Sequence, residues 1–270
     1  TYTYDGGKGT KMKGDFSLNK GTVLKILIGQ QSLPGERMTG GGGGTFVVQE
    51  GADTTKAPFG ALIVAGGGGG SGTSGGNGKD ASTAENGVNG YPNYGFGEDG
   101  DGHGDGLNSN ANSGWGSTGS GIKGDGSYQT TTYKYDVALS DRAKSFHNGG
   151  QGAQPRGLAT GSSCQGNKGG FGGGGAGACN GGGGGGGYSG GGAGGGGGGS
   201  YNGGTNQENQ SGVNASHGKV IITALSSGQE LLYTPEADWN GTDTISITAS
   251  DNDSASTAET VSIQVNPVND

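Results

Sequence analysis

Apolar side chains are scarce in this chain. Hydrophobic residues fill only 27% of the 270 positions, and charged residues fill only 14%. An ordinary globular domain is roughly 45–50% apolar, whereas a charge-driven disordered chain carries far more charge. The composition therefore excludes one large hydrophobic core. We expect small cores, combined with structure that backbone hydrogen bonds hold together.

Several other absences narrow the range of functions. No run of about 18 apolar residues occurs, so we expect no membrane insertion. The net charge is -8 and no Lys/Arg cluster stands out, so we expect no nucleic-acid partner. The sequence lacks G-x-S-x-G and HExxH motifs, and its histidines (His103, His147 and His217) lie far apart. We therefore expect a protein that is not an enzyme. Because no initiator Met or signal peptide opens the sequence, we expect a processed chain or a piece of a longer one.

Cysteine is rare, with only Cys164 and Cys179 present. Two thiols are too few for a four-ligand zinc site, and His147 lies at no metal-ligand spacing from them. A disulfide between them would close a loop of about 15 residues and stabilise the fold by roughly 3 kcal/mol. We expect this disulfide, and with it an oxidising, extracellular or cell-surface location. Two unpaired thiols are the alternative.

Glycine, by contrast, is abundant, with 72 residues and its longest runs within 161–204. Collagen is excluded because prolines number only 6 and no three-residue repeat is kept. A flexible Gly/Ser linker is the alternative, but serine is rare in these runs and the cysteines flank them. We expect a bundle of left-handed, three-residue polyglycine II helices. Only glycine lets backbones approach closely enough to satisfy one another's N–H and C=O groups.

Strand patterns occupy other parts of the chain. Alternating or continuous apolar segments predict strands at 1–5, 16–18, 23–28, 45–50, 61–65 and 219–224. Glycine runs directly precede Thr45 and follow Ala65, so we expect the glycine segments to pack against these strands. One short helix is predicted at 137–146.

Ordered blocks across residues 6–223 resemble the glycine-rich extracellular domain of anaplastic lymphoma kinase and leukocyte tyrosine kinase. The blocks are GDFSLNKGTVLKILIGQQS, GGGGGTFVV, PFGALIVAGGGGG, GGFGGGGAGACNGGGGGGGYSGG and HGKVIIT. The resemblance implies a TNF-like β jelly roll that carries an inserted bundle of polyglycine II helices. It also places Cys164 and Cys179 where that family has a cysteine pair. No growth-factor-like module, membrane helix or kinase follows these blocks, so receptor signalling and cytokine ligands are not carried over.

The segment 227–270 differs in kind from the rest. Its YTPEADWNGTD and closing NPVND resemble the second half of a bacterial cadherin-like repeat, as found in giant surface adhesins. Strands are predicted at 230–234, 243–249 and 259–265. An Ig-like sandwich needs about seven strands. We expect the missing ones to come from upstream of residue 1, from a neighbouring subunit or from the glycine-rich part.

The predicted fold class is therefore mostly β, in two domains. The first, 1–226, is glycine-rich. Its strands lie in 1–65 and 219–224, with the glycine bundle and its loops at 66–218. The second, 227–270, is a partial Ig/cadherin-like β-sandwich.

Oxygen-bearing side chains in the tail match the ligands that calcium prefers. They are Asp251, Asp253, Asn269 and Asp270. In cadherin-like arrays such residues bind calcium at domain junctions, so the resemblance implies calcium as a cofactor. A polar turn and a solvated end are the alternative. The acidic segment 97–106 is a single copy without the nine-residue calcium repeat, which favours a solvated loop.

The function that these patterns favour is a non-enzymatic extracellular adhesion or ligand-binding module of a large bacterial surface protein. Tyr, Trp, Asp and Asn gather at 85–135, which indicates loops that bind a glycan or a protein on a rigid scaffold. Alternatively, Phe96 and Trp115 plug the bundle ends. A second candidate is a structural subunit of an extracellular filament or matrix, whose neighbouring copies complete the sandwich by strand addition. An ice-binding surface is disfavoured because a Thr-x-Thr array is missing.

Overall fold

The computed structural model describes residues 4–33, 38–73, 76–91, 95–102, 116–127, 141–155, 166–178, 180–226, 229–233, 241–247 and 259–265. Within these ranges the protein is mostly β and extended structure without an α-helix, and its short 3-10 helix is η2 (Phe146–Asn148). The strands are β1 (Gly9–Asp15), β2 (Leu24–Leu27), β3 (Thr45–Gln49), β4 (Ala61–Ala65), β5 (Tyr201–Asn202), β6 (Thr205–Asn214), β7 (Ile222–Ser226), β8 (Gln229–Tyr233), β9 (Gly241–Ile247) and β10 (Glu259–Val265). The expectation of a mostly β fold is confirmed.

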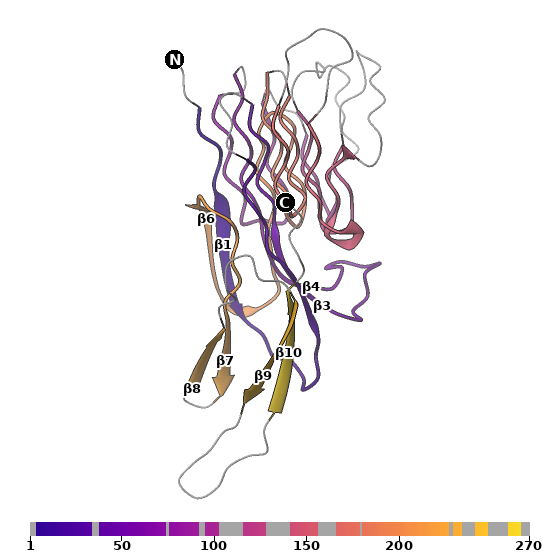
Figure 1. The fold of residues 1–270 in the computed structure, drawn as a ribbon, viewed down its shortest axis with the longest axis vertical. Helices are drawn as coiled ribbons and strands as arrows, with labels where there is room; N and C mark the ends of the chain where they lie inside the picture. The colour runs from indigo at the N-terminus through magenta and orange to yellow at the C-terminus, as the bar shows by residue number, and fades with distance from the viewer. Residues whose placement is uncertain are drawn as a thin grey trace, which may run out of the picture.

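The described strands form one large sheet and two hairpin-like pairs. The six-stranded sheet has the order β5-β4-β3-β2-β10-β9, and β1 pairs with β6 and β7 with β8. All pairings are antiparallel except that of β10 with β2, which is parallel. In Figure 1 the labelled strands β3, β4 and β7–β10 lie toward one end of an elongated molecule, and the glycine-rich segments run side by side at the other.

The tail's strands find their partner within the same chain. β10 pairs with β9 along its whole length, from Glu259↔Ile247 to Val265↔Gly241. It then lies beside β2 through Gln264↔Lys25 and Val265↔Ile26. Among the sources expected for the missing strands, the glycine-rich domain 1–226 supplies one neighbouring strand, β2.

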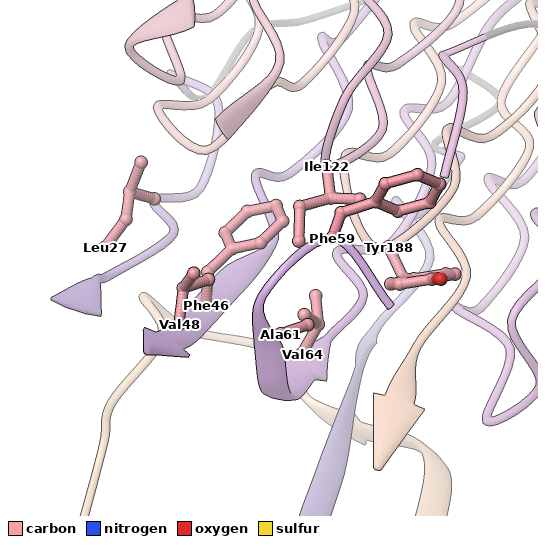
Figure 2. Packing of buried hydrophobic residues seen from close by; sticks show 8 residues of the cluster. All are labelled: Leu27, Phe46, Val48, Phe59, Ala61, Val64, Ile122 and Tyr188. Carbon is pink, nitrogen blue, oxygen red and sulfur yellow. The ribbon is translucent and has the colours of Figure 1, made fainter. Parts of the chain in front are cut away.

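The main core lies between the six-stranded sheet and the glycine-rich segments of 66–218 (Figure 2). Phe46 and Val64 from adjacent strands are 1% and 0% exposed, and they pack with Ile122 and Tyr188 from the glycine-rich part. The Phe46 ring lies 5.1 Å from the ring of Phe146. A smaller cluster around Ile26 and Val47 covers the opposite face of the sheet, as expected from the side-chain alternation of a strand.

The glycine runs are packed, not dangling. Every residue from 181 to 200 is buried. In the segment 181–188, hydrogen bonds return to the same neighbouring segment every three residues. Gly183 and Gly186 donate to the carbonyls of Thr39 and Gly42, respectively. Gly184 and Gly187 donate to those of Ser117 and Ser120. Gly185 and Tyr188 donate to those of Gly196 and Gly199. A three-residue recurrence matches a helix of three residues per turn and differs from the two-residue period of a strand.

The carbonyl groups of the same segment show the same recurrence toward other neighbours. The carbonyls of Gly183 and Gly186 accept the N–H groups of Gly70 and Gly67, respectively. Those of Gly181 and Gly184 accept from Ala178 and Gly175. Those of Gly182 and Gly185 accept from Gly194 and Gly191. Backbone groups that lack water are therefore paired on both the donor and the acceptor side. The glycine segments thus form a hydrogen-bonded body, as the runs beside Thr45 and Ala65 predicted.

Some predicted elements are wrong. Residues 16–18 are not a strand, because β1 ends at Asp15, and Tyr4 and Asp5 do not lie in a strand either. The described part of the predicted helix, 141–146, is not α-helical. Asp141 has 3-10 conformation and η2 begins at Phe146, whereas between them Asp125 from a distant segment accepts the N–H of Ser145, which an α-helix would bond to a carbonyl four residues earlier.

The Asp125 carboxylate organises this turn and makes its stability depend on pH. Burial favours the neutral acid. Hydrogen bonds from the backbone of Ser145 and from the side chains of Asn148 and Lys144 outweigh burial and hold the pKa of Asp125 below its ordinary value of 3.8. A carboxylate with a depressed folded-state pKa contributes stability above its unfolded-state pKa. That contribution is lost as the pH falls through the folded-state pKa.

We therefore expect Asp125→Asn to lower the free energy of unfolding at pH 7 by about 1–2 kcal/mol, since it weakens charge-assisted hydrogen bonds. Urea titrations of both proteins at pH 7 and at pH 2–3 measure the difference. The gap between variant and wild type should shrink at the acidic pH. An equal gap at both pH values would argue against a role for the charge.

Candidate functional site

A polar hollow of about 440 Å³ lies where β5 and β6 meet the segment 83–86. Its walls come from residues 83–86 and 200–202 and from Gln207 and Asn209 of β6. Six of its nine lining residues are exposed, so the hollow is shallow and open to solvent. This hollow is the candidate functional site.

Pairing with the sheet and with the glycine segments positions its walls. β5 lies at the edge of the six-stranded sheet, where Tyr201 pairs with Val64 and Asn202 pairs with Ile63 of β4. The N–H of Ser200 donates to the carbonyl of Ala84 at 2.8 Å, which holds the segment 83–86 beside β5. This hydrogen bond ties the segment 83–86 to the end of the buried glycine run that precedes Ser200.

Amide side chains line the floor in a connected network. Asn202 Nδ2 donates to Asn209 Oδ1 at 2.8 Å and to the carbonyl of Lys13 at 2.8 Å. Asn209 Nδ2 donates to Gln207 Oε1 at 3.0 Å, and Gln207 Nε2 donates to the carbonyls of Asn202 and Gly204. These bonds fix the orientation of the amides before any ligand arrives, which reduces the entropy cost of binding.

Tyr201 gives the hollow an aromatic wall with a rigid support. Its ring stacks on Tyr188 at a centroid distance of 5.0 Å and an interplanar angle of 22°, and Tyr188 is 1% exposed. Burial and then the Glu85 carboxylate raise the pKa of Tyr188 to about 12, and the same causes raise the pKa of Tyr201. Both phenols therefore keep their protons near neutral pH, and the Tyr201 hydroxyl stays a hydrogen-bond donor.

The hollow is lined by polar groups. The described residues of its lining contribute hydroxyl, amide and carboxylate groups, with no histidine, cysteine, lysine or arginine among them. In the ranges that the structure describes, no group of three or more His, Cys, Asp or Glu residues is placed to hold a metal ion. The lining therefore offers hydrogen-bond donors and acceptors to a ligand.

All six site residues predicted from the sequence lie outside the described residues. They are Cys164, Cys179, Asp251, Asp253, Asn269 and Asp270. The disulfide and the calcium site therefore stay predictions.

The predicted binding region 85–135 is described only in part, because 103–115, 128–135 and the short stretch 92–94 lie outside the described ranges. Trp115 is in the first of these gaps. In the acidic segment 97–106, the Asp101 carboxylate lies 3.3 Å from the Lys123 ammonium. Tyr91, which precedes that segment, is 46% exposed. The structure adds one connection: Glu85 and Asn86, at the start of this region, line the hollow.

Sequence patterns did not predict the side of the hollow that β5 and β6 form. TNQENQSGVN forms β6 although it has no apolar alternation, because backbone pairing with β1 holds it, and its residues are mostly exposed. Tyr201, Asn202, Gln207 and Asn209 thus escaped prediction. The dense cluster of Asn and Gln after Gly204 was the signal that could have pointed to a polar surface.

A family model for a bacterial Ig domain matches residues 201–264. The match supports the prediction that the tail is a bacterial Ig- or cadherin-like part. It covers about a quarter of the chain, and it begins at Tyr201, upstream of the boundary predicted near residue 226. No curated protein matches the chain. The resemblance of 6–223 to the glycine-rich domain of the two receptor kinases therefore stays a prediction.

The described part of the chain contains no helix long and apolar enough to span a lipid bilayer.

Proposed function

We propose that this chain is a non-enzymatic, extracellular adhesion or ligand-binding module of a large bacterial surface protein. Bacterial Ig-like domains commonly occur in surface or adhesin-type proteins, and the match at 201–264 supports that coarse assignment. The observation that carries the binding role is the preformed polar hollow. Its amides are held in place by one another, and its aromatic wall is supported by a buried ring.

The glycine segments serve, in this proposal, as a bundle of polyglycine II helices. The three-residue recurrence of hydrogen bonds around 181–188 and the complete burial of 181–200 support it. Such a bundle presents few side chains of its own. Its role is to hold loops and sheet edges at fixed positions, which is how recognition surfaces are usually built.

The pairing of β10 with β2 favours a self-contained module over a filament subunit. Assembly by strand addition needs an open sheet edge that a neighbouring copy can complete. Here β10 of the same chain occupies the edge of β2, so a neighbouring copy would have to add to β5 or β9, the edge strands of the described sheet. A monomer at high concentration in analytical ultracentrifugation would agree with this arrangement.

A binding array tests the proposal. We expect the chain to bind members of a mixed array of immobilised glycans and peptides. The double variant Glu85→Gln/Asn86→Ala should lose that signal, because both side chains line the hollow and neither makes a hydrogen bond with a described residue. Thermal unfolding serves as the control and should be unchanged in the variant. Absence of binding to every class of probe would contradict the proposed function.

A further inference from the structure

We propose that the hollow formed by residues 83–86, Tyr201, Asn202, Gln207 and Asn209 binds an uncharged saccharide. This inference rests on the proposed function, since it names the ligand class of the same site. It follows from the charge, the hydrogen-bonding groups and the aromatic wall of the hollow.

The charge of the lining argues against anionic ligands. Among the described residues that line the hollow, Glu85 is the only charged one. On β1, the ammonium of Lys13 is 2.6 Å from Glu208. Because Glu208 alternates with Gln207 and Asn209 along β6, this ion pair lies on the other face of the strand. A phosphate, sulfate or sialic acid would therefore meet a carboxylate with no compensating cation at the site, which is unfavourable.

The uncommitted polar groups suit a ligand that carries many hydroxyls. The side chains of Thr83, Glu85 and Asn86 and the hydroxyl of Tyr201 make no hydrogen bond with any residue that the structure describes. Together they offer hydroxyl and amide groups, which both donate and accept, and a carboxylate, which accepts. A sugar ring presents hydroxyls that donate and accept in several directions at once, whereas an amine only donates.

Tyr201 provides the apolar surface that a sugar ring also needs. The pyranose ring has C–H groups on its faces, and these pack on aromatic rings. Because one face of Tyr201 is stacked on the buried Tyr188, the side chain is held in position, and its amphipathic character suits a site that is partly wet. An amide network at fixed geometry completes the site opposite this wall.

The test uses the whole chain on one array with three classes of probe. These are neutral glycans built from hexoses, N-acetylhexosamines and deoxyhexoses, sialylated or sulfated glycans, and lysine-rich peptides. The strongest neutral glycan is then titrated by calorimetry against wild type and Asn86→Ala. We expect at least about a tenfold weakening in the variant, which corresponds to the loss of one or two hydrogen bonds.

Gln210→Ala is the matched control. Gln210 is an exposed amide one position beyond Asn209 on β6 and belongs to the opposite face. Its variant should bind as wild type does. Binding of only charged glycans or basic peptides would overturn the saccharide inference and leave the proposed function standing. Equal weakening by both variants would also overturn it, and no binding in any class would overturn the proposed function itself.

Discussion

Gly185→Ala should abolish folding of the glycine segments. A methyl carbon at Gly185 would overlap the carbonyl oxygen of Gly67, and it would also lie 2.9 Å from the backbone nitrogen of Gly198. Both obstacles are backbone atoms, which cannot rotate away as the end of a flexible side chain can. We expect a loss of at least about 4 kcal/mol, a size reserved for a few severe mechanisms such as overpacking of a close-packed interior.

The neighbours of Gly185 have little freedom to yield. Gly67 donates its N–H to the carbonyl of Gly186 and accepts the N–H of Gly198, so a shift of one segment strains the bonds of the next. Since total stability is typically about 5–15 kcal/mol, a loss of this size leaves the module mostly or wholly unfolded. Thermal and urea unfolding followed by circular dichroism measure the effect.

Gly42→Ala is the matched control for this prediction. Gly42 also lies within a run of glycines and is half-buried, but a methyl group there would meet its nearest backbone atoms at 3.6 Å, an ordinary contact distance. We expect the Gly42 variant to retain most of the stability of the wild type. Equal stability of the two variants would mean that the runs behave as flexible linkers.

Phe46→Ala should give the second large loss, about 3–5 kcal/mol in the free energy of unfolding. Phe46 is 1% exposed, and it packs between the sheet and the glycine-rich part in the cluster of Figure 2. Its ring also lies 5.1 Å from that of Phe146. Because the chain has few apolar residues, we expect little repacking of neighbouring side chains into the cavity that truncation leaves.

Urea unfolding at 25 °C measures this loss, with Leu33→Ala as the control. Leu33 is 68% exposed, so its truncation should change stability by less than about 0.5 kcal/mol. A small loss for Phe46→Ala would mean that the sheet and the glycine-rich part are held together by backbone hydrogen bonds alone. A loss shared equally by both variants would place the core elsewhere.

Local sequence patterns predicted a good part of the sheet. The apolar runs found β2, β3 and β4, and the tail's alternation found β10 with its bounds. These strands bury side chains on one or both faces, so the requirement for burial is written into consecutive residues. The ends of β7, β8 and β9 are displaced by one to three residues from the prediction, because hydrogen bonds with a partner strand decide where a strand stops.

β6 and the hollow could not be predicted in the same way. β6 is exposed along most of its length and carries no burial signal, so only its pairing with β1 shows that it is a strand. The hollow combines Glu85 and Asn86 with Tyr201 and Asn209, which lie more than a hundred positions away. Side chains that meet only through folding leave no spacing that a motif could reveal.

The amino-acid sequence by itself determined that this protein has no large core, that its strands lie around its glycine runs, and that its tail resembles a bacterial Ig- or cadherin-like repeat. The first two properties follow from composition and from short-range periodicity, and the third follows from the resemblance of YTPEADWNGTD and NPVND to such repeats. Only the tertiary structure decided which segments surround the glycines of 181–188, that β10 lies beside β2, and where polar groups converge. Glycine backbones carry no side chains to specify their partners, so their register is set by the strands, serines and aromatic rings packed at their ends.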